Sequence, residues 1–347
     1  MKVRISACRA RLRAPFTAAY GELAQRSLIV VALEGEDGIT GFGEAAPLQP
    51  YDGVSTDHVR AALEDCTALL RDCDGTARAE LLAACRDVAV LPQAIAAIDL
   101  ALWDLAGRRA GEPIWRLLGA SEPGPVDVNW TIGATDRAGA AAEADQARAA
   151  GFGCVKVKVG VGDDAGRLAA VRAAGGSGLT IRVDANGVWS SEEATAALRA
   201  LAPVGVELCE EPASGVEEIR RVWTASDVAI AIDETAAAPG ALEQRCCDAV
   251  CLKIARSGGI SGVIEQAAQA DRAGYDVYVA STFDGPLGIA AALHVAAVLE
   301  PRRACGLATL GLFEGRADPL PPREGRIALP HGPGLGDGLT DWYRVAG

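Results

Sequence analysis

The chain has few of the residues that mark several common classes of protein. It has three histidines among 347 residues and no Cys-x-x-Cys spacing, so neither a histidine-rich site nor a zinc ribbon is expected. No apolar run approaches the ~18 residues that a membrane helix needs. Basic residues number 33 against 46 acidic ones, and the net charge is −13. This balance argues against nucleic acid and anionic membranes as partners.

Ten cysteines are present, but their setting does not suggest disulfide bonds. Several lie in apolar runs, and Cys246 and Cys247 are adjacent, which is an awkward spacing for a bridge. Residues 1–5 alternate between apolar and basic types and do not lead into the apolar run of a secretory signal. We therefore expect free thiols and a cytoplasmic protein.

The first third of the chain predicts a module of mixed α and β structure. An antiparallel meander is expected from three strand-like segments, residues 2–13, 26–34 and 39–44. Helical periods follow, over residues 56–71, 76–87, 93–110 and 113–118. Two intervening stretches, residues 15–25 and 47–55, are expected to be flexible loops that cover a site elsewhere.

From residue 126 onward, strand-like runs alternate with Ala-rich helical segments. The apolar runs lie at residues 126–131, 154–159, 179–184, 205–210, 228–233, 248–254, 276–281 and 304–309. Helices are expected to begin between them, near Arg137, Ala165, Ser191, Val216, Ala238, Ser261 and Pro286. This alternation predicts a parallel sheet buried on both faces, and eight repeats predict a closed barrel. Residues 318–347 lack the pattern and are expected to return to the N-terminal module.

Carboxylates recur at the ends of the middle strands, about one βα unit apart. Asp184, Glu210 and Asp233 each follow an apolar run. The carboxyl ends of barrel strands meet at one rim, where active sites are built. Three carboxylates at that rim repel one another unless a cation lies between them, and all-oxygen ligation favours Mg²⁺, with Mn²⁺ as a substitute, over zinc. For any one of them alone, pairing with a neighbouring Lys or Arg is the simpler interpretation.

Three lysines accompany these carboxylates. Lys156 and Lys158 lie two residues apart on one strand, so both side chains point to the barrel interior. Buried lysines need anionic partners or a lowered pKa, and a lowered pKa suits a general base. Lys253 ends the sixth strand, opposite the second. A metal-bound carboxylate substrate would then lie between Lys158 and Lys253, and Mg²⁺ would stabilise the enediolate formed on loss of the neighbouring proton.

These segments together resemble the enolase superfamily, in its muconate-lactonising subgroup. The resemblance is carried by Lys156-Val-Lys158, Asp184-Ala-Asn186, Glu210-Glu211-Pro212, Asp233-Glu234-Thr235 and Leu252-Lys253-Ile254. It implies an α/β fold: a modified TIM barrel, (β/α)7β, under an N-terminal α+β capping domain that the C-terminal tail completes. The implied domain limits are 1–120, 121–317 and 318–347. The resemblance also implies Mg²⁺ on Asp184, Glu210 and Asp233, with Lys158 and Lys253 flanking the substrate and Lys156 and Asn186 in support.

The outcome of the reaction is predicted from residues outside these segments. The stretch Ser281 to Gly288 resembles the Ser-x-x-Glu…Gly stretch of o-succinylbenzoate synthases and cycloisomerases, but Asp284 replaces the usual Glu. The acid is shorter by one methylene, which leaves its reach to Lys253 open. The segment Gly306-Leu307-Ala-Thr-Leu also resembles those synthases, although close packing alone would account for it. Dipeptide epimerases carry an Asp-x-Asp pair here to hold the substrate ammonium, and no acid lies between Pro301 and Phe313.

We therefore predict an o-succinylbenzoate synthase, a lyase that carries out a syn-dehydration in menaquinone biosynthesis. Lys158 would remove the proton and then protonate the departing hydroxyl, while Lys253 would stabilise the enediolate. The alternatives are a muconate-type cycloisomerase, an N-acylamino acid racemase or dipeptide epimerase, and a non-catalytic carboxylate-binding barrel. We expect a homo-oligomer that binds a small carboxylate. Candidate contacts from the cap are Tyr20, Arg26 and Tyr51, which ordinary loop or strand positions would explain equally well.

Overall fold

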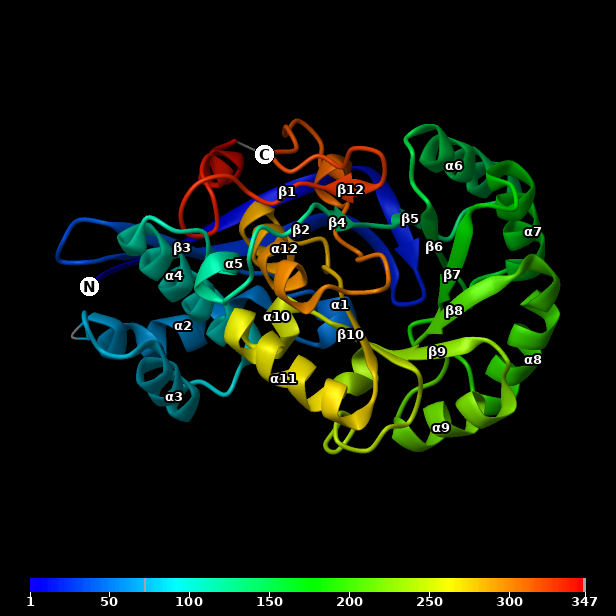
Figure 1. Ribbon diagram of the computed structural model, residues 1–347, viewed down its shortest axis with the longest axis horizontal. Coiled ribbons are helices and arrows are strands. Elements are labelled where there is room, and N and C mark those ends of the chain that lie inside the picture. The colour runs from blue at the N-terminus through cyan, green and yellow to red at the C-terminus, as the bar shows by residue number, and fades with distance from the viewer. Residues whose placement is uncertain (72, 346–347) are drawn as a thin grey trace.

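A computed structural model describes residues 1–71 and 73–345. An antiparallel sheet with its helices lies beside a curled parallel sheet, whose outer side carries helices (Figure 1). None of the helices in the described ranges is long and apolar enough to cross a membrane. The α/β class and the separate N-terminal module are as the sequence predicts.

The N-terminal sheet has the strand order β1-β2-β3. Its strands are β1 (Lys2–Ala18), β2 (Gly21–Glu34) and β3 (Thr40–Ala45). The flexible loop expected at residues 15–25 is wrong: β1 and β2 continue pairing to Ala18 and Gly21, with a register shift between Arg11 and Phe16. The hairpin tip could not be recognised from these small residues. The alternation that marks a strand is lost where the register shifts.

Alternation along β2 gives this strand two buried faces. Ile29, Val31 and Leu33 pack in one core with the first helices, whereas Leu28 and Val30 belong to the core of the barrel. Successive side chains of a strand point to opposite faces, so one strand joins the two cores. The helices on this side are α1 (Gln49–Asp52), α2 (Thr56–Arg71), α3 (Arg78–Val88), α4 (Pro92–Ala110) and α5 (Ile114–Leu117).

The parallel sheet has the strand order β11-β10-β9-β8-β7-β6-β5. Its strands are β5 (Trp130–Ile132), β6 (Cys154–Lys158), β7 (Thr180–Asp184), β8 (Val206–Glu210), β9 (Ala229–Ile232), β10 (Ala249–Leu252) and β11 (Asp276–Val279). The two edges meet through Cys305 and Gly306, which form parallel bridges to Val128 on one side and Ala280 on the other. The predicted eighth strand is thus reduced to these two residues, and the chain then turns into η3 (Leu310–Leu312).

Helices cover the outer side of the barrel (Figure 1). They are α6 (Arg137–Ala149), α7 (Asp164–Gly175), α8 (Ser191–Leu201) with η1 (Ala202–Val204), α9 (Val216–Ala225), α10 (Ile254–Ser257), α11 (Gly259–Ala273) and α12 (Pro286–Leu299). The helix expected near Ala238 is wrong. After β9 the chain forms only η2 (Glu234–Ala237), and Pro239-Gly240 follows, a pair that interrupts helical backbone.

The last residues run back along the N-terminal module. Arg316 donates to the Arg9 carbonyl at 2.9 Å, Leu335 N donates to Asp104 Oδ1 at 2.7 Å, and the Tyr343 hydroxyl bonds to the Glu44 carboxylate. β12 (Arg326–Ile327) pairs with β4 (Val126–Asp127), and η4 (Leu339–Arg344) is the last element of the described chain. The three-part division at residues 120 and 317 stays a prediction.

The cysteines form no disulfide bond within the described residues. All ten are free thiols, and each is buried except Cys73, which is half-buried. Cys246 and Cys247 lie in the barrel core, as an apolar setting requires.

Candidate active site

A cavity of ≈ 40 Å³ lies at the carboxyl ends of the barrel strands, under the tip of the β1–β2 hairpin. The N-terminal module contributes Phe16, Tyr20, Leu48 and Tyr51. The barrel contributes Thr131, Lys156, Lys158, Asp184, Asn186, Asp233, Lys253, Ala280, Ser281, Thr282, Phe283, Gly306 and Thr309. Because both modules contribute to the lining, neither the cap nor the barrel segments alone define the site.

Strand register brings the first part of the cluster together. Lys158 pairs across β6 and β7 with Asp184, which pairs across β7 and β8 with Glu210. Lys158 Nζ donates to Asp184 Oδ2 at 2.6 Å and to Asn186 Oδ1 at 2.8 Å. Lys156 Nζ lies 3.1 Å from Asp184 Oδ2 and 2.9 Å from Glu210 Oε1. Two lysines and two carboxylates therefore form one continuous buried ion-pair network.

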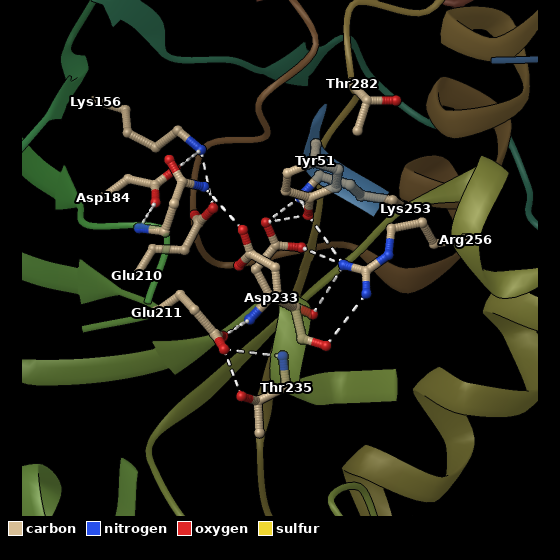
Figure 2. Close-up of polar contacts among 12 residues, drawn as sticks. Tyr51, Lys156, Asp184, Glu210, Glu211, Asp233, Thr235, Lys253, Arg256 and Thr282 are labelled. Carbon is tan, nitrogen blue, oxygen red and sulfur yellow. Dashed lines mark hydrogen bonds and ion pairs between the residues drawn. The ribbon is translucent and has the colours of Figure 1, made fainter. Parts of the chain in front are cut away.

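The second part of the cluster gathers on Asp233, at the end of β9. Figure 2 shows Tyr51, Lys253 and Arg256 converging on this carboxylate. The Tyr51 hydroxyl donates to Asp233 Oδ2 at 2.8 Å, and Lys253 Nζ forms an ion pair with the same oxygen. Lys253 Nζ and Arg256 Nη1 both donate to the Tyr51 hydroxyl at 3.0 Å. A residue of the cap thus donates a hydrogen bond to a barrel carboxylate.

The buried charges shift one another's protonation. Burial lowers the pKa of Lys156 and Lys253, but the adjacent carboxylates, Glu210 for one and Asp233 for the other, outweigh burial and raise both pKa values. Burial raises the pKa of Asp184, but Lys158 and Lys156 outweigh it and hold that pKa below its usual range. A buried lysine was expected to have either anionic partners or a lowered pKa. Lys156 and Lys253 have anionic partners.

Part of the cluster has the donor arrangement of a cation site. Glu210, Asp233 and Cys251 each offer a donor atom, and these atoms lie within 4.8 Å of one another. Asp233 Oδ1 is buried and has no hydrogen-bond partner among the described residues. Burial raises the pKa of the Cys251 thiol well above its usual value, so the thiol stays protonated and the two carboxylates are the effective donors. Hard oxygen donors suit Mg²⁺ rather than a soft ion.

Asp184, the third ligand expected from the sequence, lies outside that group of donors. Its Oδ2 atom is held by Lys158 and Lys156. The two ammonium groups therefore supply the positive charge that this carboxylate needs in the described arrangement. Lys156 bridges Asp184 to Glu210, and donor atoms of Glu210 and Asp233 lie within 4.8 Å of one another, so the three carboxylates remain neighbours.

Two residues beside these carboxylates have left-handed backbone. Asn186 has φ 48° and Glu211 has φ 39°, a region that costs a residue with a side chain of order 1 kcal/mol or more. The Glu211 carboxylate accepts bonds from Asp233 N at 2.7 Å and Thr235 N at 2.9 Å. These bonds hold the strained turn and fix the backbone of Asp233, so Glu211 orients the carboxylate next along the rim.

Some of the expected substrate contacts lie behind the lining of the cavity. Arg26 is 2 % exposed, and its guanidinium donates to three backbone carbonyls, those of Phe283 at 3.3 Å, Pro47 at 2.7 Å and Ala46 at 2.8 Å. Arg26 does not line the cavity, and its three bonds join the cap to the barrel, so we interpret it as a structural clamp; its contact with substrate stays a prediction. Asp284 accepts bonds from Thr282 N and Oγ1 at 3.1 and 2.8 Å, so it turns toward its own loop and not toward Lys253. Leu307 is buried beside the cavity, whereas Gly306 and Ser281 line it.

Other residues of the site escaped the sequence analysis. Cys251 and Tyr278 lie on barrel strands with inward side chains, and Tyr278 Oη donates to Glu210 Oε2 at 2.6 Å. Cys251 precedes Lys253 by two residues, so the period of a strand could have placed both on one face. Phe16, Leu48 and Phe283 carried no comparable signal, because their place in the lining depends on how the cap meets the barrel.

Comparison with known proteins places the whole chain in one family. Residues 139–341 match the family described as "Enolase C-terminal domain-like", and residues 1–119 match the N-terminal domain of mandelate racemase / muconate lactonizing enzyme. The chain is 30% identical to the D-Ala-D/L-Ala epimerase of Cytophaga hutchinsonii, over 96% of this chain and 94% of that protein. It is also 30% identical to muconate cycloisomerase 1 of Rhodococcus opacus, over 95% and 94%. The structure of a dipeptide epimerase from Enterococcus faecalis, complexed with Mg and L-Leu-L-Tyr, superposes with a TM-score of 0.90 at 26% identity, over 96% of this chain and 98% of that one. The chain therefore belongs to the enolase superfamily, with the N- and C-terminal domains of its mandelate racemase and muconate-lactonising branch.

Proposed function

We propose that this chain is a Mg²⁺-dependent isomerase that removes the proton next to a substrate carboxylate and returns it, as a racemase or epimerase does. The observation that carries the proposal is the placement of two lysines in one cavity. Lys158 lines it from the end of β6 and Lys253 from the end of β10, with β7, β8 and β9 between them. A substrate held between these strands presents one face of its α-carbon to each lysine.

Asp184, Glu210 and Asp233 are the residues that we propose to hold Mg²⁺. The buried Oδ1 atom of Asp233 supports this assignment, since it accepts no hydrogen bond among the described residues and its one ion-pair contact, with Arg256, is at 3.6 Å. When bound, the ion supplies positive charge beside the substrate carboxylate, which gains negative charge as its neighbouring proton leaves. Relatives of this chain have been solved with Mg, which supports the same choice of ion.

Each of the two lysines has a neutral partner that fixes the direction of its ammonium. Lys158 Nζ donates to the Asn186 amide oxygen, and Lys253 Nζ donates to the Tyr51 hydroxyl. These partners hold the two nitrogen atoms in place without neutralising them. In the proposed reaction one lysine first loses its own proton to solvent and then accepts the α-proton as a neutral amine, and the other donates a proton from the opposite face.

The o-succinylbenzoate synthase reaction remains a second candidate, supported by the Gly306–Thr309 segment. It is the weaker one for two reasons. The relatives named above are epimerases and a cycloisomerase, and Asp284 bonds to Thr282 instead of extending toward Lys253. The cycloisomerase reaction also removes or delivers a proton next to a carboxylate, so it shares the lysine and metal requirements.

Deuterium exchange at the α-carbon tests the proposal. Wild-type protein with Mg²⁺ in deuterated water is offered N-acylamino acids, dipeptides, a muconate and the synthase substrate. We expect exchange into both enantiomers of an amino acid derivative. Lys158→Ala should lose exchange from one enantiomer and Lys253→Ala from the other, each by at least ~10³-fold, because each removes the base for one face.

The exposed Lys2 provides the control, since Lys2→Ala should exchange both enantiomers at the wild-type rate. Two results contradict the proposal. One is dehydration of the synthase substrate without exchange elsewhere, and the other is a single lysine variant that abolishes exchange from both enantiomers while the second variant has no effect.

A further inference from the structure

We infer that the substrate of this cavity is a monocarboxylate whose remaining part carries no charge, represented by an N-acyl α-amino acid with a neutral acyl group and a neutral side chain. This inference rests on the proposed function, which supplies the carboxylate and the reacting α-carbon. It concerns the other end of the substrate, where the cavity wall is formed by the cap and by the loops after β11.

The charged groups of the described lining all belong to the lysine and carboxylate cluster. They are Lys156, Lys158, Asp184, Asp233 and Lys253. The rest of the described lining is aromatic, aliphatic, amide or hydroxyl in character, and consists of Phe16, Tyr20, Leu48, Tyr51, Thr131, Asn186, Ala280, Ser281, Thr282, Phe283, Gly306 and Thr309. A charge on the distal part of a substrate would therefore face neutral groups.

Four charged side chains behind the wall formed by the cap and by the loops after the last strands, Arg26, Arg256, Asp284 and Glu44, are already engaged. The three guanidinium bonds of Arg26 go to backbone carbonyls, and those of Arg256 go to the Tyr51 hydroxyl and to the Asp233 and Glu234 carbonyls. Asp284 accepts two bonds from Thr282, and Glu44 accepts bonds from Gly285 N and the Tyr343 hydroxyl. Recruiting any of them for a substrate would break a buried network, so none is available as a counter-charge.

The cover of the cavity adds to the cost of a distal charge. Tyr20 packs edge-on against Tyr51 with ring centroids 5.7 Å apart, and Phe16 packs against Phe283 at 4.9 Å. Both pairs are part of the lining, so they present ring surface and not charged groups to the cavity. An ammonium or a second carboxylate beneath them would lose its hydration without gaining a partner.

Hydroxyl groups supply what an uncharged amide needs. Ser281 Oγ and Thr309 Oγ1 lie 3.1 Å apart, and each can rotate to donate to a carbonyl oxygen or accept from an amide N–H. Gly306 lies beside them. A Cβ at this position would approach the Ala280 Cβ to 2.9 Å, so the backbone of Gly306 packs closely against Ala280. An acyl amide could satisfy both hydroxyls, whereas a dipeptide ammonium or a dicarboxylate would need an ion of opposite charge.

A matched series of ligands tests the inference. N-acetyl-, N-glycyl- and N-succinylalanine share the carboxylate and α-carbon but carry a neutral, a cationic and an anionic acyl group. Binding is measured by calorimetry on Lys158→Ala with Mg²⁺, and turnover by deuterium exchange on the wild type. We expect the N-acetyl compound to be favoured over both charged ones by ~10²-fold or more, in dissociation constant and in kcat/KM.

A pair of variants extends the test to the wall itself. Thr309→Asp should shift the preference toward the cationic N-glycyl compound by ~10-fold or more, whereas Thr309→Val removes the hydroxyl without adding charge and should not favour it. Equal or tighter binding of a charged compound to the Lys158→Ala protein overturns the inference. Selective binding of the N-acetyl compound without exchange of any ligand by the wild type leaves the inference standing and refutes the proposed isomerase instead.

Discussion

Replacement of Arg26 by methionine should destabilise the protein strongly, because this residue joins the two walls of the cavity. Its guanidinium binds Ala46 and Pro47 of the cap and Phe283 of the barrel, and its side chain is 2 % exposed. Methionine fills much of the volume but leaves three buried carbonyl groups without donors. Each unsatisfied group costs about 1–3 kcal/mol, and water entering the gap recovers part of this, so we expect a loss of about 3–5 kcal/mol.

The free energy of unfolding is measured by urea titration with circular dichroism. Arg26→Lys keeps the charge but has a compact head that cannot serve three acceptors at once, so its loss should be intermediate. Arg4→Met is the control, since Arg4 is an exposed partner of Glu34 at 3.3 Å, and it should change stability by less than about 0.5 kcal/mol. A loss below about 1 kcal/mol for Arg26→Met, together with lost turnover, would show that Arg26 contacts substrate and that the clamp is wrong.

Three further predictions concern groups around the cavity and in the core. Burial lowers the pKa of His294 to about 4, so the stability contributed by its neutral ring is present above pH ~6.5 and is lost as the pH falls toward 4, by about 3 kcal/mol. His294→Gln lacks this titration, and equal pH slopes of unfolding free energy for variant and wild type would contradict the assignment. Mg²⁺ at ~100 times its dissociation constant should stabilise the wild type by about 2.7 kcal/mol, and Asp233→Asn should lose most of this effect in thermal melts; an undiminished shift would exclude Asp233 as a ligand. Glu211→Ala should cost about 2–4 kcal/mol by leaving Asp233 N and Thr235 N without acceptors, whereas Glu211→Gln retains one acceptor oxygen and should cost less; equal losses in urea titrations would argue against that role.

The barrel and its charged rim could be predicted from sequence because both depend on local period. The strands ending at Lys158, Asp184 and Glu210 were foreseen from apolar runs of the right length, and their register follows once the strands are parallel. The sequence does not specify which charged side chain pairs with which. The pairing of Lys156 with two carboxylates, and the donation of Tyr51 to Asp233, depend on side-chain reach across strands and modules.

The errors have the same origin in tertiary structure. Small residues at 15–25 indicated a loop, yet pairing with the rest of the hairpin keeps them in strands. The run at 304–309 looked like a strand, but only Cys305 and Gly306 bridge their neighbours, because the closing segment must turn at Thr309 to line the cavity. The place of Arg26 among backbone carbonyls was not foreseen, because residue type does not show which groups a buried guanidinium binds.

The return of the tail to the first strands has a consequence for how this protein is made. The Tyr343–Glu44 bond joins residues 299 positions apart, and the Arg316–Arg9 bond joins residues 307 positions apart. Neither bond can form during synthesis until almost the whole chain has left the ribosome. The hairpin that covers the cavity must therefore wait, with part of its barrel-facing surface uncovered, while the barrel units emerge in order. The cover of the active site is the first element synthesised and among the last to reach its final contacts.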